Sequence, residues 1–84
     1  MNSNYDQPYR SKDLMLSAAL LATGLPLKDT ENEGSHVVFL FENSPKARDI
    51  EQEWWSGSLT VNAIKYSESI KRLKSLVHAK LCLG

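Results

Sequence analysis

The chain has 84 residues, of which 42% are hydrophobic and 24% are charged, and its formal net charge is zero. This length suits one small domain with a modest core, and the composition is too apolar for a disordered chain. Without a net charge, the protein has no global field that would attract nucleic acid or a membrane surface. The single cysteine, Cys82, excludes an internal disulfide and favours a reduced, cytoplasmic protein.

Charge is nevertheless distributed unevenly along the chain. Three basic and two acidic residues give residues 1–28 a net charge of +1. Residues 29–53 carry seven acids and two bases, a net charge of −5, whereas residues 54–84 carry five bases and one acid, a net charge of +4. The pattern predicts a dipolar molecule that is acidic in its middle segment and basic at its C-terminal end.

The first ten residues differ from the rest of the chain. Residues 1–10 are polar, show no hydrophobic periodicity and contain Pro8. Such a segment is typical of a chain terminus that packs loosely. We therefore predict a flexible N-terminal arm over residues 1–10 and a single compact domain over residues 11–84.

An apolar helix is predicted after this arm. Ser11 is a candidate N-cap, and Gly24 followed by Pro26 marks the end. Nearly every residue between them is apolar, so the helix is either buried nearly all round or offers spare apolar surface, including Met15, to a partner. Basic residues precede this run as in a signal peptide. Because Asp13 adjoins the run and it is too short to cross a membrane, we predict neither secretion nor membrane insertion.

The longest run of β-branched and aromatic residues lies at residues 36–42. Apolar side chains occupy both faces of this run, which predicts a strand that is covered on both sides. We expect it to pair with residues 25–31 as a β-hairpin, with acidic turn residues around Gly34. Pro26 cannot donate to a ladder, so the first strand of the hairpin is expected at a sheet edge.

Three further elements are predicted in the second half of the chain. Ser44 and Pro45 mark the start of a helix that ends at Gly57. Residues 58–61 alternate as in a short third strand or an extended connector, and Asn62 caps a last helix. The predicted fold is therefore α+β, in the order α-β-β-α-(β)-α, with a small antiparallel hairpin sheet packed by three helices.

In order and spacing, these segments resemble a family of uncharacterised small α+β domains from bacteria and their phages. The matching pieces are two helix starts, the central strand, the paired tryptophans with their glycine, and parts of the last helix, namely residues 11–14, 37–42, 44–45, 54–57, 61–62 and 73–76. The resemblance covers about residues 11–78. It implies a cytoplasmic protein of a bacterial cell or a phage-infected host, in a phage or mobile-element setting. It transfers no activity and no catalytic residue to this chain.

The residue types that catalysis or metal binding requires are not arranged for either. His36 and His78 have no Cys, His or Asp at a metal-ligand spacing. The serines lack the local frame of a nucleophile elbow, and the glycines are too scattered to cradle a phosphate. We therefore predict no catalytic residue, no metal site, no cofactor and no enzymatic activity.

Paired tryptophans form the first candidate binding surface. Trp54 is in phase with the inner face of its helix, whereas Trp55 lies about 100° further round, at the margin. A partly exposed tryptophan is a common anchor in protein interfaces. We therefore predict a protein interface of Trp55, Trp54 and Met15 in a non-enzymatic accessory factor of phage or mobile-element type, such as an anti-defence inhibitor. The predicted partner is a protein or a nucleoprotein complex, and a homodimer is compatible with the same surface.

The basic face of the last helix is an alternative binding surface. Lys65, Lys71, Arg72 and Lys74 could hold the phosphates of a nucleic acid, which would make the chain a nucleic-acid-binding accessory protein. The same residues also fit a solvated helix face or a contact with an acidic patch of another protein. These alternatives stay open at the level of sequence.

Overall fold

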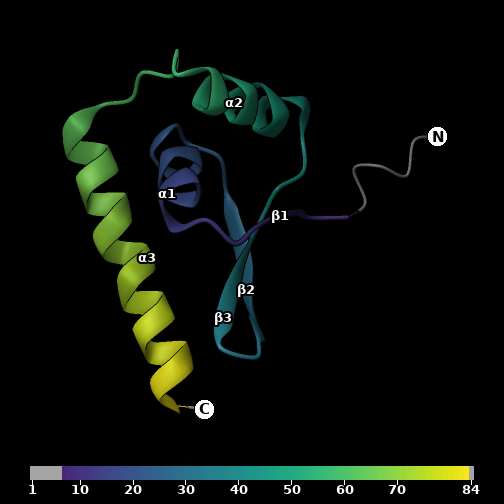
Figure 1. Ribbon diagram of the computed structural model, residues 1–84, viewed down its shortest axis with the longest axis vertical. Coiled ribbons are helices and arrows are strands. Elements are labelled where there is room, and N and C mark those ends of the chain that lie inside the picture. The colour runs from purple at the N-terminus through teal and green to yellow at the C-terminus, as the bar shows by residue number, and fades with distance from the viewer. Residues whose placement is uncertain (1–6, 84) are drawn as a thin grey trace.

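The computed structural model describes residues 7–83, which form one antiparallel sheet and three helices (Figure 1). In chain order the elements are β1 (Tyr9–Ser11), α1 (Leu14–Ala22), β2 (Leu27–Glu33), β3 (His36–Phe41), α2 (Pro45–Ser56) and α3 (Ala63–Leu83). The strands lie in the order β1-β3-β2, so β3 is central. Helices α1 and α3 pack together on one side of the sheet, and α2 packs against α1. This arrangement confirms the predicted α+β class.

Strand β3 forms the centre of the hydrophobic core. All of its residues except the first are buried. On the side that faces the helices, Val37, Phe39 and Phe41 pack in one cluster with Leu20 of α1 and Leu73 of α3. Burial of this apolar surface is the main favourable contribution to folding. The prediction of a central strand buried on both faces is therefore confirmed.

The second face of β3 is covered by charged side chains from the neighbouring strands. Val38 and Leu40 are 0% and 6% exposed, yet they stand outside the cluster that contains the helices. Arg10 of β1 is paired with Leu40, and Glu31 of β2 is paired with Val38. The Arg10 guanidinium forms ion pairs with Glu31, at 3.0 Å, and with Glu33, so its side chain reaches across β3 to the other edge of the sheet. The aliphatic stems of these charged residues thus cover an apolar face that no helix covers.

The predicted hairpin is confirmed, with small shifts at its ends. Strand β2 begins and ends two residues later than predicted, and β3 ends one residue earlier. Gly34 has a φ of +65° in the turn, a left-handed conformation that favours glycine. Strand β2 lies at a sheet edge, as Pro26 predicted, and its many carboxylates discourage pairing with a further strand.

The last residues of the predicted N-terminal arm belong to the sheet. Tyr9 and Arg10, which we assigned to the arm, belong to strand β1 and pair with Phe41 and Leu40. The ladder of a strand is made by backbone groups, so three residues can join a sheet without any hydrophobic periodicity to reveal them. Residues 1–6 of the predicted arm lie outside the described residues.

The third strand of the sheet is β1, and of the two options predicted for residues 58–61 the short strand is not formed. After Gly57, whose φ is +78°, the backbone N–H groups of Ser58 and Leu59 both donate to the carbonyl of Glu53. These bonds complete the C-terminus of α2, and the following residues are an extended connector, the other option that the alternation left open.

Helix α1 begins at a different cap from the one predicted. Asp13, not Ser11, is the N-cap, because its carboxylate accepts from the backbone N–H groups of Met15, at 2.9 Å, and Leu16, at 3.1 Å. Ser11 is in β1 instead, and its buried hydroxyl accepts a 2.7 Å hydrogen bond from Ser17. Both residue types are good caps, so only the pairing of β1 decides between them.

The other predicted helix boundaries are confirmed. Helix α1 ends with Gly24 in the left-handed region directly after the C-cap, and α2 ends at Gly57. Pro45 is the first residue of α2, and Ser44 is its N-cap, although the serine side chain makes no capping hydrogen bond. The side chain of Asn62 accepts a 2.9 Å hydrogen bond from the backbone N–H of Lys65 at the start of α3.

Candidate functional site

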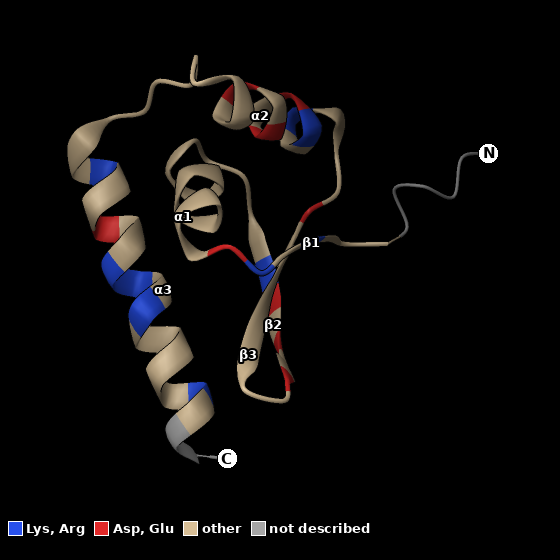
Figure 2. Ribbon diagram, in the orientation of Figure 1, with Lys and Arg blue, Asp and Glu red and all other residues tan. Residues whose placement is uncertain are grey.

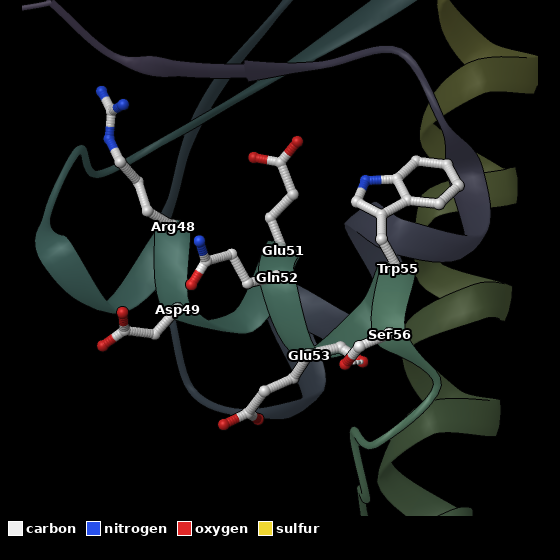
Figure 3. Close-up of a pocket in the computed structure, with 7 residues that line it drawn as sticks. All are labelled: Arg48, Asp49, Glu51, Gln52, Glu53, Trp55 and Ser56. Carbon is white, nitrogen blue, oxygen red and sulfur yellow. Dashed lines mark hydrogen bonds between the residues drawn. The ribbon is translucent and has the colours of Figure 1, made fainter.

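The outer face of helix α2 presents an exposed tryptophan among charged residues (Figure 3). We call this surface the α2 face; it consists of Arg48, Asp49, Glu51, Gln52, Glu53, Trp55 and Ser56. Of the aromatic side chains within residues 7–81, only that of Trp55 is mostly exposed, at 68%. All seven residues belong to one helix, so the α2 face is an open surface and not an enclosed pocket.

Helical periodicity explains why the two tryptophans point in different directions. Ala47 and Ile50 are buried and Trp54 is half-buried against the core, which places these three residues on the inner side of α2. Trp55 is the next residue along the helix and therefore lies about 100° away, outside this inner side. The predicted interface is thus divided, because Trp54 packs inward and does not join Trp55 on the α2 face.

A hydrogen bond from strand β1 holds α2 in place beside this surface. The hydroxyl of Tyr9 donates to Oε1 of Glu51, which lies on the same side of α2 as Trp55 and Arg48 (Figure 3). Burial raises the pKa of Tyr9, and the hydrogen bond to Glu51 and the charge of that carboxylate raise it further, although Arg48 opposes them. The neutral phenol, which can donate a hydrogen bond, is therefore the favoured form of Tyr9. Its bond to Glu51 joins two residues that are 42 positions apart in the chain.

Met15, the third residue of the predicted interface, lies on a different part of the molecule. Its side chain is 42% exposed at the start of α1, next to Tyr66 of α3. The Tyr66 hydroxyl donates to the backbone carbonyl of Met15 at 3.3 Å, and burial, followed by the charge of Asp13, raises the pKa of Tyr66. Met15 is absent from the α2 face, so the structure does not bring Met15 and Trp55 together.

The basic residues of α3 are exposed but do not form one patch. No ion pair within the described part of the chain engages Lys65, Lys71, Arg72 or Lys74. Lys65 and Arg72 border a small cleft on the α1 side of the helix, and they share it with Glu68. Lys74 borders a different groove, which is beside β3. A nucleic acid backbone following this helix would therefore meet the predicted residues on two sides.

The predicted charge asymmetry is visible in the fold (Figure 2). Nearly all of the charged residues of α3 are basic, whereas most of those on β2 and α2 are acidic. Because α3 lies at one side of the molecule, the two signs of charge are separated in space as well as along the chain.

The fold also brings together residues that the sequence analysis did not combine. His36 at the start of β3, His78 and Lys74 of α3, and Lys12 border one groove of about 490 Å³. Lys74 and His78 are one helical turn apart on α3, but only tertiary structure shows that His36 and Lys12 lie beside them. Within residues 7–83 no group of three or more His, Cys, Asp or Glu side chains is placed to hold a metal ion.

Comparison with known proteins identifies the family of this chain. The chain belongs to the family described as "Domain of unknown function (DUF5659)", whose model matches residues 6–79. The predicted resemblance to an uncharacterised small domain family is therefore confirmed, over slightly more of the chain than expected. No curated protein and no solved structure matches the chain. Across the described residues, no helix combines the length and apolar character needed to cross a membrane.

Proposed function

We propose that this protein is a non-enzymatic module that binds another protein through the α2 face, with Trp55 as the anchor. The observation that carries the proposal is the 68% exposure of this indole on a helix whose opposite side is locked into the core by Ala47 and Ile50. Exposing a tryptophan to water is unfavourable, and a rigid aromatic side chain loses little entropy when a partner covers it. An accessory role in the cytoplasm belongs to the same proposal.

The charges around Trp55 indicate what its partner offers. Asp49 and Glu53 lie on the opposite side of α2 from Arg48, and both carboxylates are exposed (Figure 3). Trp55 lies on the same side as Arg48, but the α2 face as a whole carries the carboxylates of Asp49, Glu51 and Glu53 against one base. A net acidic face suits a partner with basic groups, since complementary charges orient two proteins and speed their encounter. We therefore propose a partner with a basic surface.

The experiment compares two single variants of the whole chain. Trp55→Ala removes the anchor, whereas Ile64→Ala removes a side chain that is 70% exposed on α3. If the α2 face is the interface, a partner captured after nuclease treatment is retained by wild type and Ile64→Ala and is lost on Trp55→Ala. Loss of a central aromatic anchor should weaken binding by about 2 kcal/mol or more. A partner that binds wild type and Trp55→Ala equally well contradicts the proposal.

A nucleic-acid-binding accessory role is the second candidate. It is favoured by one observation, that the four basic residues of α3 are exposed and have no ion-pair partner in the described part of the chain. Their distribution over two sides of the helix argues against it. A phage or mobile-element setting and an anti-defence role remain predictions from the family resemblance.

A further inference from the structure

A groove of about 490 Å³ runs between the first half of β3 and the C-terminal half of α3. Its apolar lining comes from three elements, namely Leu14, Val37, Phe39, Val77 and Leu81. Leu81 is 41% exposed although it is a large apolar residue, so part of this lining is open to water. The volume is in the range of ordinary ligand-binding clefts. This β3–α3 groove is a surface separate from the α2 face.

Lysine and histidine side chains surround the apolar lining. Lys12, His36, Lys74 and His78 border the groove, and none of its ten lining residues is an acid. The ammonium of Lys12 lies 3.5 Å from Glu33 but remains 66% exposed, and Lys74 is exposed without an ion pair inside residues 7–83. A ligand that combines apolar groups with carboxylates would therefore satisfy both the lining and the rim.

The first half of β3 forms one wall of the same groove. Strand β1 pairs only with Phe39, Leu40 and Phe41, so the first three residues of β3 have β2 on one side and no strand on the other within residues 7–83. His36 and Val37 belong to this stretch and also line the groove. Val37 is only 6% exposed, so this stretch contributes an apolar wall to the groove and not a free strand edge.

We infer that the β3–α3 groove binds an acidic peptide segment that also carries apolar side chains. The apolar lining of the groove takes the apolar side chains, and the basic rim orients the segment through its carboxylates. Apolar side chains of the segment contact Val77 and Leu81, and its carboxylates lie near Lys12 and Lys74. Phe39 is only 1% exposed, so its ring offers no face on which a nucleic acid base could stack.

The test begins with selection from a displayed library of random eight-residue peptides against the whole chain. We expect enriched peptides that combine carboxylates with apolar residues. Fluorescence anisotropy with one labelled enriched peptide then compares Leu81→Asp and Lys74→Glu with matched controls on the same helix, Ile64→Asp and Lys71→Glu. The two groove variants should bind about tenfold more weakly or worse, and the two controls should bind like wild type.

Several results overturn the groove as an acidic peptide site. They are the absence of any enriched peptide, enrichment of peptides without carboxylates, and equal binding to Leu81→Asp and wild type. If single-stranded DNA displaces the labelled peptide, the basic residues at the rim of the groove bind phosphates and not carboxylates. A dimer in sedimentation that dissociates on Leu81→Asp would make a second copy of the chain the occupant. Trp55→Ala should leave peptide binding unchanged. The proposal for the α2 face and the proposal for the groove can therefore be rejected independently of each other.

Discussion

At the scale of single residues, Tyr9 shows how a short strand gains a fixed place. Strand β1 has only three residues, and its ladder alone provides few hydrogen bonds. The phenol of Tyr9 adds a bond to the carboxylate of Glu51, which lies on α2 and not in the sheet. Hydrogen bonds to charged acceptors are stronger than neutral ones, so this contact stabilises both β1 and the position of the α2 face.

Tyr9→Phe should destabilise the protein at neutral pH by about 1 kcal/mol, because the bond to Glu51 is lost while the ring remains. Burial and Glu51 raise the pKa of Tyr9 in the folded protein above its unfolded value of about 10. The contribution of Tyr9 is therefore complete below about pH 10 and is lost as the pH rises through the folded pKa, since the unfolded chain releases this proton first. Urea unfolding measures the free energy of unfolding of both proteins at neutral pH and above about pH 10. The difference between wild type and Tyr9→Phe should be smaller at the higher pH.

The comparison with Tyr9→Phe isolates one titration among several. Every other ionisable group is present in both proteins, so its contribution to the free energy of unfolding cancels in the difference. Glu51→Gln is the matched control, because the amide oxygen can still accept the bond but carries no charge to raise the pKa of Tyr9. A difference between wild type and Tyr9→Phe that stays constant with pH would show that the proton on Tyr9 does not matter to folding.

The helix caps show what local sequence can and cannot reveal. Gly24, Gly57 and Asn62 were predicted because a glycine or asparagine next to a periodic segment has a direct conformational reason to be there. The N-cap of α1 was missed because Ser11 and Asp13 are both good capping residues two positions apart. The choice between them depends on β1, which pairs Ser11 with a strand far along the chain.

At the scale of elements, the sheet has one face covered by helices and one covered by charged side chains. The sequence shows that both faces of β3 are apolar, but nothing local shows how the second face is covered. The answer depends on the register, which places Arg10 opposite Leu40 and Glu31 opposite Val38. An ion pair that spans a strand can be predicted only after the strand order is known.

Substitutions of Arg10 can separate two contributions to stability, namely the apolar surface that its aliphatic stem covers and the ion pairs of its guanidinium. Arg10→Ala should lower the free energy of unfolding by about 1 kcal/mol, since it uncovers Val38 and Leu40 and breaks ion pairs that are individually weak at an exposed site. Arg10→Met keeps an aliphatic stem of similar length and should lose less. Urea unfolding in low and high salt measures these losses. Salt should reduce the difference in the free energy of unfolding between wild type and Arg10→Met, because that difference comes from ion pairs. Most of the difference between wild type and Arg10→Ala should remain in high salt. Equal losses for Met and Ala would mean that the stem contributes no cover.

At the scale of the whole molecule, the predictable features are those that each segment carries by itself. The hairpin, the three helices and the central strand all follow from runs of apolar residues and their boundaries. The third strand and the β3–α3 groove do not, because β1 depends on backbone pairing and the groove depends on the contact between β3 and α3. The same holds for the candidate site. The periodicity of one helix predicted that Trp55 lies at the margin of its inner face. No local feature predicted that Met15 lies on a different part of the molecule.

The separation of charge over the whole molecule gives the last prediction, which concerns nucleic acid. A nucleic-acid-binding protein needs several cations along one path, and each phosphate contact makes the affinity fall more steeply with salt. Here Lys65 and Arg72 lie on one side of α3, and Lys74 lies on another. We therefore expect single- and double-stranded DNA to bind no more tightly than about 0.1 mM near physiological salt, which is weak even for non-specific binding. Titration of labelled DNA over a salt series measures both affinity and slope. If wild type binds in the micromolar range with a steep salt slope, and Lys71→Glu combined with Lys74→Glu abolishes that binding, the basic helix is the functional surface and the proposal for Trp55 fails.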